Sequence, residues 1–400
     1  MSDVSEMRWQ LPVGLDEILP PDGARYEQLR RNLIDLFEAW GYDLVIPPLV
    51  EYLDSLLTGT GQDLDLQTFK LTDLESGKTL GVRADMTPQV SRIDAHPLKR
   101  EGPSRLSYIG TVLRTRPAGV ARSRSPVQVG AELYGHAGID SDDEVVRLML
   151  ACLQVARIEP IHLDLGHVAI FNQLASAAGV APAQQSRLFD ALQRKSSLDL
   201  SRIIDELSPS PYTDALLALP ALHGGVEILD EARRQLGAAG AEVLQAIAEV
   251  EALAERISQR AGFAEVYVDL AELRGYHYHT GVVFAAFTAG HGQEIARGGR
   301  YDGVGAAFGR ARAATGFSTD LRTLLLVGHA PAVERSGILA PRAAGDVALQ
   351  AEISRLRARG ERVVETLDGQ TLDYTELGCD RVLHKGDDGE YRVLALTSGS

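Results

Sequence analysis

The chain has 400 residues, of which 45% are apolar and 24% are charged. This composition can bury a sizeable core, and the length favours two or more lobes. Lys and Arg number 40 against 55 Asp and Glu, which gives a formal net charge of −15. Such a surface repels phosphate backbones unless a local basic patch overcomes it. Residues 331–400 carry 12 acidic and 9 basic side chains, so we expect neither this segment nor the chain as a whole to bind tRNA.

Composition also bears on the compartment. Residues 1–11 lack the basic stretch and apolar run of a signal peptide, and we find no uncharged stretch of about 18 residues that could cross a membrane. The two cysteines, Cys152 and Cys379, form no CxxC pair, which is typical of a reducing compartment and argues against a cysteine zinc site. The sequence predicts a cytoplasmic protein without membrane contact.

The hydrophobic pattern predicts an α+β fold. Apolar residues recur every three or four positions over 23–40, which predicts an amphipathic helix. Further helices are predicted over 141–157, most of 170–260, from about 304, and over 347–359. Strands are predicted at 43–46, 68–71, 79–83, 105–113, 127–135, 266–270, 282–287, 293–296, 362–366, 381–384 and 392–396. The strands gather into antiparallel pairs with helices at the margins. We expect a core over 1–328 with a helical insertion at about 170–260, and a small C-terminal α/β lobe over 329–400.

The predicted strand 127–134 offers a possible ligand site. Alternation places Gln128, Gly130, Glu132 and Tyr134 on one face of the strand. A glycine between an amide and a carboxylate leaves a hollow with a polar group at either end, which suits a small zwitterion. An ordinary half-exposed strand remains the alternative.

The segment 274–281 is dense in aromatic and imidazole groups. Arg274 could bind a carboxylate or phosphate with its planar fork. His277 and His279 could be metal ligands, but no third ligand lies nearby in the sequence. A structural turn with surface aromatics is the third interpretation.

Two further segments are ambiguous by themselves. The glycine pair in 297–303 allows close backbone approach to a ligand or a neighbouring strand, or forms a turn. Asp85 and Thr87 could receive an amino group, or could cap a helix that starts near Pro88.

Taken in order, these segments resemble one family. The string 41–48 is similar to the first motif of class II aminoacyl-tRNA synthetases, and 113–132 is similar to the second. The segments 274–278 and 298–302 resemble signatures of histidyl-tRNA synthetases. The resemblance covers about residues 11–326 and implies a class II synthetase-like core, with an antiparallel sheet flanked by helices.

The resemblance implies a histidine site and no metal or cofactor. A carboxylate and a threonine would hold the amino group, and aspartate stands at position 85 where the family usually has glutamate. Histidine stands at position 279 where the family usually has tyrosine. The implied histidine-binding residues are Asp85, Thr87, Arg114, Gln128, Glu132, Arg274, Tyr278, His279 and Tyr301.

The implied nucleotide side departs from the synthetase pattern. The second motif reads Leu-Arg-Thr-Arg, so that Arg116 replaces a glutamate that accepts from adenine. Pro126 stands where a ring should stack on adenine, and Thr323 stands where an arginine should hold the γ-phosphate, although Arg322 is adjacent. These changes predict loss of amino-acid activation.

The combination resembles the regulatory subunits of ATP phosphoribosyltransferase. That resemblance implies a non-catalytic subunit that works with a short-form catalytic subunit in the first step of histidine biosynthesis and mediates feedback inhibition by histidine. It also implies a homodimer through the core within a hetero-oligomer. The alternatives are a working histidyl-tRNA synthetase and a free-standing histidine-binding protein.

Overall fold

The computed structural model describes residues 9–59, 62–117, 123–260, 264–273, 278–329, 336–342, 345–370, 373–374 and 376–396. The chain divides into two compact units, Met1–Ala330 and Pro331–Ser400, which are described separately below. Among the described residues, no helix is both long and apolar enough to cross a membrane.

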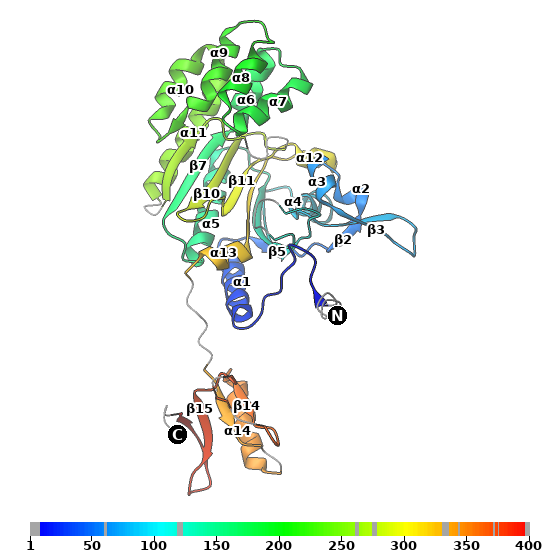
Figure 1. Ribbon diagram of the computed structural model, residues 1–400, viewed down its shortest axis with the longest axis vertical. Coiled ribbons are helices and arrows are strands. Elements are labelled where there is room, and N and C mark those ends of the chain that lie inside the picture. The colour runs from blue at the N-terminus through cyan, green and yellow to red at the C-terminus, as the bar shows by residue number, and fades with distance from the viewer. Residues whose placement is uncertain are drawn as a thin grey trace, which may run out of the picture. The chain divides into compact units, whose positions relative to one another are not determined.

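The first unit is built on a nine-stranded sheet of described residues (Figure 1). Its pairs are antiparallel except β1 with β5 and β7 with β9, which are parallel. The strands, in spatial order, are β1 (Asp43–Leu44), β5 (Ser104–Thr111), β6 (Val127–Tyr134), β12 (Ala314–Asp320), β11 (Ala296–Arg300), β10 (Val282–Thr288), β7 (Ile161–His167), β9 (Ala264–Asp269) and β8 (His223–Gly224).

Helices cover one face of this sheet. Helix α1 (Asp22–Ala39) buries Leu29, Leu33 and Phe37 at intervals of four, and it contacts α5 (Ile139–Val155) and α13 (Leu321–Val327). The strand β6 shows how the two faces differ. Val129 and its alternate neighbours enter the large core beneath these helices, whereas Tyr134 enters a second apolar cluster on the other face. The predicted alternation over 127–134 is confirmed, and it leaves the polar face of β6 for a site.

Smaller elements border that second face. A three-stranded antiparallel sheet runs in the order β2 (Val50–Tyr52), β4 (Thr79–Val82), β3 (Phe69–Thr72). The short helices nearby in the chain are α2 (Leu53–Leu56), α3 (Gln62–Gln67), α4 (Thr87–Ile93) and the π-helix η2 (Asp94–Leu98). A further short helix, α12 (Val304–Ala307), comes from much later in the chain. Helix α4 carries candidate site residues at its amino end and contacts α12.

The helical insertion forms a bundle at one end of the unit (Figure 1). Its members are α6 (Val168–Ala177), α7 (Pro182–Gln193), α8 (Ser197–Ile204), α9 (Pro211–Ala218), η3 (Leu219–Ala221), α10 (Ile228–Leu236), η4 (Gly237–Ala239) and α11 (Ala241–Arg260). The last of these also contacts α5, β7 and β9, so the bundle shares the core of the sheet.

The second unit is a four-stranded sheet with one helix, α14 (Val347–Ala358). Its strand order is β14 (Val363–Glu365), β13 (Ile338–Ala340), β15 (Arg381–Lys385), β16 (Tyr391–Ala395). The helix buries Leu349, Ile353 and Leu356, which pack with Ile338 and Leu383 of the sheet.

The α+β prediction is confirmed, with local differences. The sequence pattern missed strands at 50–52, 161–167, 223–224, 314–320 and 338–340 and a helix at 321–327. It also placed a strand at 293–296 that runs instead over Ala296–Arg300. The glycine pair therefore lies inside a strand, not in a turn. A Cβ at Gly298 would stand 2.1 Å from the carbonyl oxygen of Gly316, so the glycine permits close approach of two strands.

Candidate functional site

The centre of the candidate site is the carboxylate of Glu132, on the polar face of β6. The residue is only 2% exposed. Its Oε1 accepts hydrogen bonds from the hydroxyls of Tyr108 (2.9 Å) and Thr87 (3.1 Å), and its Oε2 accepts one from Tyr301 (2.5 Å). These hydroxyls come from β5, α4 and the end of β11, so the tertiary fold assembles the cage from four separate segments.

The electrostatics of Glu132 follow from this burial. Removal from water raises the pKa of the carboxyl to about 7, against the lowering effect of the hydroxyls of Tyr301, Tyr108 and Thr87. The nearby carboxylate of Asp85 raises the pKa slightly further. The carboxyl therefore changes its charge close to neutral pH, which marks it as a candidate functional group.

Two glycines make room for this arrangement. Gly316 of β12 pairs with Glu132 across the sheet, and a Cβ at Gly316 would stand 1.5 Å from the Oε2 atom of that glutamate. A Cβ at Gly130 would stand 2.4 Å from the hydroxyl oxygen of Tyr108. Any side chain at either position would displace a member of the cage. The prediction that Gly130 leaves a hollow is refined: part of that space is filled by Tyr108.

A second carboxylate lies at the mouth of the same site. Asp85 Oδ1 accepts hydrogen bonds from the backbone N–H of Thr87 (2.8 Å) and from Nε2 of Gln128 (3.1 Å). The side-chain oxygen Oε1 of Gln128 accepts a hydrogen bond from the backbone N–H of Met86 (2.9 Å). Gln128 thus fixes the loop before α4 to β6, and Thr87 joins the two carboxylates, since its N–H contacts Asp85 and its hydroxyl contacts Glu132.

The capping interpretation of Asp85 and Thr87 holds only in part. Helix α4 begins at Thr87, and its N-cap residue, Met86, makes no side-chain capping bond. Asp85 does satisfy one N–H of the first turn, which stabilises the helix start. The hydroxyl of Thr87 instead points into the cage. The structure therefore brings Asp85, Thr87, Gln128, Glu132 and Tyr301 together.

The remaining predicted residues lie around this centre or outside the described chain. Arg114 donates from Nε to the carbonyl oxygen of Ala84 at 3.2 Å, beside Asp85. His279 is buried, Tyr278 is 45% exposed, and their ring centroids are 4.2 Å apart. Arg274 lies outside the described residues, as does His277. The described part of the chain contains no group of three His, Cys, Asp or Glu side chains that could hold a metal.

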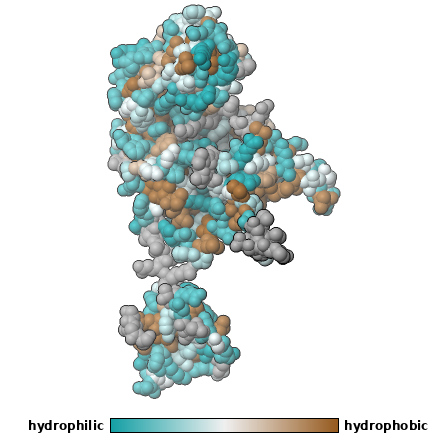
Figure 2. All heavy atoms as spheres, in the orientation of Figure 1, coloured by the Kyte–Doolittle hydropathy of each residue, from teal (hydrophilic) through white to brown (hydrophobic). Residues whose placement is uncertain are grey.

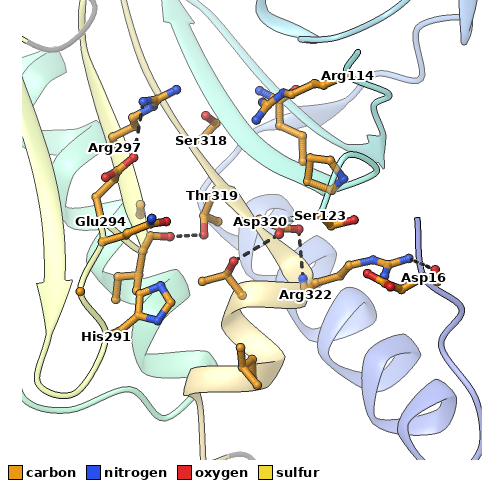
Figure 3. A pocket seen from close by; sticks show the side chains of 18 residues that line it. Asp16, Arg114, Ser123, His291, Glu294, Arg297, Ser318, Thr319, Asp320 and Arg322 are labelled. Atoms are coloured by element: carbon orange, nitrogen blue, oxygen red, sulfur yellow. Dashed lines mark hydrogen bonds and ion pairs between the residues drawn. The ribbon is translucent and has the colours of Figure 1, made fainter. Parts of the chain in front are cut away.

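A cavity of about 710 Å³ adjoins Gln128 (Figure 3). Its lining includes Pro126 and Thr323, two of the three positions at which the sequence departs from the synthetase pattern. The lining residues are Asp16, Arg114, Ser123, Pro126, Gln128, His291, Gly292, Gln293, Glu294, Ile295, Ala296, Arg297, Ser318, Thr319, Asp320, Arg322, Thr323 and Leu326.

Two lining residues that bear on phosphate binding are already engaged. The hydroxyl of Thr323 donates to Asp320 Oδ2 at 3.2 Å. Arg322 donates from Nη2 to the backbone carbonyl of Asp16 at 2.9 Å (Figure 3). Asp320 also caps α13 through the N–H of Arg322. The amino end of α13 is thus capped by a carboxylate, whose negative charge repels a phosphate there.

Sequence reasoning missed Tyr108 and Gly316. Tyr108 lies in a predicted strand, but its place opposite Gly130 depends on the register of two paired strands, which the structure provides. Gly316 carried no local signal, because its strand was not predicted and its role depends on a partner across the sheet.

Replacing Tyr301 by phenylalanine should raise the pKa of Glu132 above its value of about 7. The variant removes one of three hydroxyls that favour the ionised carboxylate. A carbon-13 NMR titration of the Glu132 carboxyl measures the shift. Tyr391→Phe is a matched control, because that hydroxyl donates to Asp346 in the C-terminal unit. A Glu132 titration that is the same in both variants would contradict the hydrogen-bond cage.

Comparisons with known proteins place the chain in a family. A family model described as "Histidyl-tRNA synthetase" matches residues 14–324, and one described as "ATP phosphoribosyltransferase subunit HisZ C-terminal domain" matches residues 335–394. The chain is 54% identical over 391 residues to an ATP phosphoribosyltransferase regulatory subunit of Thioalkalivibrio sulfidiphilus, covering 97% of this chain and 99% of that protein. It is 55% identical over 393 residues to a protein of the same name from Alkalilimnicola ehrlichii, covering 97% and 98%.

Solved structures show the same relationship. A crystal structure described as an ATP phosphoribosyltransferase regulatory subunit/histidyl-tRNA synthetase from Bacillus halodurans has a TM-score of 0.81 at 28% identity, covering 94% of this chain and 97% of that one. Histidyl-tRNA synthetase from Nostoc has a TM-score of 0.77 at 16% identity, covering 97% of each chain, and shares the fold. The chain belongs to the family of ATP phosphoribosyltransferase regulatory subunits, which is built on a histidyl-tRNA synthetase-like core.

Proposed function

We propose that this chain is a non-catalytic regulatory subunit that binds histidine and controls an ATP phosphoribosyltransferase catalytic subunit. One observation carries the proposal. Two carboxylates, Asp85 and Glu132, are joined through Thr87 beside a cavity whose lining includes the changed positions Pro126 and Thr323. Recognition of a small amino acid is supported, while activation of that amino acid is not.

The predicted loss of activation is supported by three positions. Arg116 is exposed and offers no acceptor to an adenine amino group. Pro126 has no aromatic face for stacking, and Thr323 carries no charge for a γ-phosphate. Removing a single preorganised contact to developing charge typically costs about 3–4 kcal/mol of transition-state stabilisation. Several such losses together are expected to abolish adenylate formation.

Histidine-dependent exchange of pyrophosphate into ATP tests this prediction. The purified chain should bind histidine in calorimetry yet show no exchange above a reaction without histidine. A histidyl-tRNA synthetase assayed in parallel provides the positive control. Exchange that depends on added histidine would favour the second candidate function, a working synthetase, for which the matching core over 14–324 is the specific observation.

The partner is proposed from the names of the relatives. We propose a short-form catalytic subunit whose phosphoribosyl transfer to ATP requires this chain and is inhibited by histidine. Inhibition would follow if the assembly state with low activity binds histidine more tightly than the active state, as any allosteric coupling requires. Mixing the two purified subunits and assaying with and without histidine tests this. A catalytic subunit indifferent to this chain would favour a free-standing histidine-binding protein.

We also propose that the core forms a homodimer within the hetero-oligomer. Apolar side chains are exposed around the first-motif segment, including Leu44, Ile46, Leu49 and Tyr52, and Figure 2 shows apolar surface in the β2–β3 region. Exposed apolar patches of this kind often mark protein–protein interfaces.

We propose that the assembly works in the cytoplasm. We also propose that it does not bind tRNA, in keeping with a net charge of −15.

A further inference from the structure

The proposed histidine pocket holds two carboxylates whose described hydrogen-bond donors are all neutral. Glu132 accepts from three hydroxyls, and Asp85 accepts from a backbone N–H and an amide. An ionised carboxylate offers about four acceptor sites. The contacts of Glu132 with described residues therefore leave room for about one more donor.

The charged groups near Glu132 do not neutralise it within the described chain. The elements packed against Glu132 contribute neutral groups and one further carboxylate. The carboxylate is Asp85, just before α4. The neutral residues are Thr87 at the start of α4, Tyr108 from β5, Gln128 and Tyr134 from β6, Gly316 from β12, and Tyr301 after β11. Arg300 is directed to Asp142, and Arg312 is directed to Asp94. Arg114 donates to the carbonyl oxygen of Ala84, beside Asp85. Residues 274–277 lie outside the described chain.

We infer that this pocket binds histidine with its imidazole ring protonated, so that an ammonium group and an imidazolium group face the two carboxylates. The inference rests on the proposed histidine-binding function and adds the charge state of the ligand. With a protonated ring, histidine carries an ammonium, an imidazolium and a carboxylate, a net charge of +1. The described pocket supplies the carboxylates of Asp85 and Glu132 and the guanidinium of Arg114 beside Asp85, a net charge of −1. An imidazolium N–H also provides the remaining donor that the Glu132 carboxylate accepts, as a charge-assisted hydrogen bond.

The carboxyl group of Glu132 can supply the proton that the ring requires. In the empty site, burial holds the pKa of Glu132 at about 7, and free imidazole has a pKa of about 6.5. Near neutral pH the carboxylic acid loses its O–H proton and the ring nitrogen gains it, which leaves a carboxylate and an imidazolium. The total charge is unchanged, and the similar pKa values make the transfer nearly balanced before the ion pair forms.

The inference predicts a defined pH dependence for binding. Above about pH 7, the free carboxyl is ionised and the free ring is neutral, so the complex takes one proton from solvent, and affinity should fall about tenfold per pH unit. Below about pH 6.5, both free groups are protonated, so binding releases one proton, and affinity should fall as the pH decreases. Affinity should therefore be highest near pH 6.5–7.

Calorimetry of the whole chain with histidine at pH 8, in phosphate and in Tris, measures how many protons are taken up from solvent on binding. These buffers differ in ionisation enthalpy, so proton uptake appears as a difference in the observed heat. We expect close to one proton per site. Glu132→Gln should lose this uptake, and it corrects for any contribution from the ligand's ammonium group. Uptake that is unchanged in Glu132→Gln would overturn the inference.

The outcomes separate the inference from the proposed function. If histidine binds with equal heats in both buffers, the inference that its ring is protonated would be overturned, while histidine binding itself would stand. No binding between pH 6 and pH 8 would overturn both. If Glu132→Gln does not bind, an analogue with a triazole ring, which is not protonated near neutral pH, serves instead. It should bind the unmodified chain about tenfold to a hundredfold more weakly than histidine, and equal affinity would overturn the inference.

Discussion

Replacing Glu132 by alanine should weaken histidine binding by about 1.5–3 kcal/mol, because the ligand would lose a charged hydrogen-bond partner in a buried site. The three hydroxyls of the cage would also lose their common acceptor. Calorimetry at pH 7 gives the affinity directly. Thermal unfolding of the same variant shows whether the fold survives.

Glu206→Ala is a suitable control for the effect on affinity. Glu206 lies in the helical insertion and pairs with Arg187 on the surface, so its loss should leave histidine affinity within experimental error. Equal affinity of Glu132→Ala and the unmodified chain would refute this pocket as the histidine site. The cavity beside Gln128 would then be the alternative histidine site.

Replacing Arg300 by alanine should lower the free energy of unfolding by about 3–5 kcal/mol, the usual cost of leaving a buried charge without its partner. The guanidinium donates to Asp142 Oδ2 from Nε at 3.1 Å and from Nη2 at 3.0 Å, and both side chains are nearly inaccessible to water. It also donates to the hydroxyl of Ser141 and to the carbonyl oxygen of Gly138, which fixes the start of α5 against β11.

Denaturant unfolding of Arg300→Ala at two pH values checks this cause. Burial already raises the pKa of Asp142, and Arg300 counters that rise. Without the arginine the pKa of Asp142 should rise further. Lowering the pH should then neutralise Asp142 and reduce the loss of unfolding free energy in Arg300→Ala. Arg297→Ala is the matched control, since Arg297 lies on the same strand with its side chain 46% exposed, and its loss should cost less than about 0.5 kcal/mol. Equal losses in the two variants would contradict the assignment.

The polar and apolar faces of β6 can be read from the amino-acid sequence alone. Alternation separated Val129 and Ala131 from Gln128 and Glu132, and the structure places the two sets in different environments. Helix α1 was equally determined, because three apolar residues four positions apart can face only one side. Such periods of two or of three to four residues follow from the regular backbone geometry of strands and helices, so they can be read from a short stretch of sequence. The family resemblance added which ligand that polar face would bind.

The use of that polar face depends on residues that the tertiary fold brings to it. Tyr108 and Gly316 became part of the site because strands adjacent to β6 place a hydroxyl and an empty space beside Glu132. The raised pKa of Glu132 comes from burial by these neighbours. The glycine pair at 298–299 was ambiguous for the same reason, since a strand with close partners and a turn require the same residue. Contacts between segments far apart in the sequence set these features, and no local pattern encodes them.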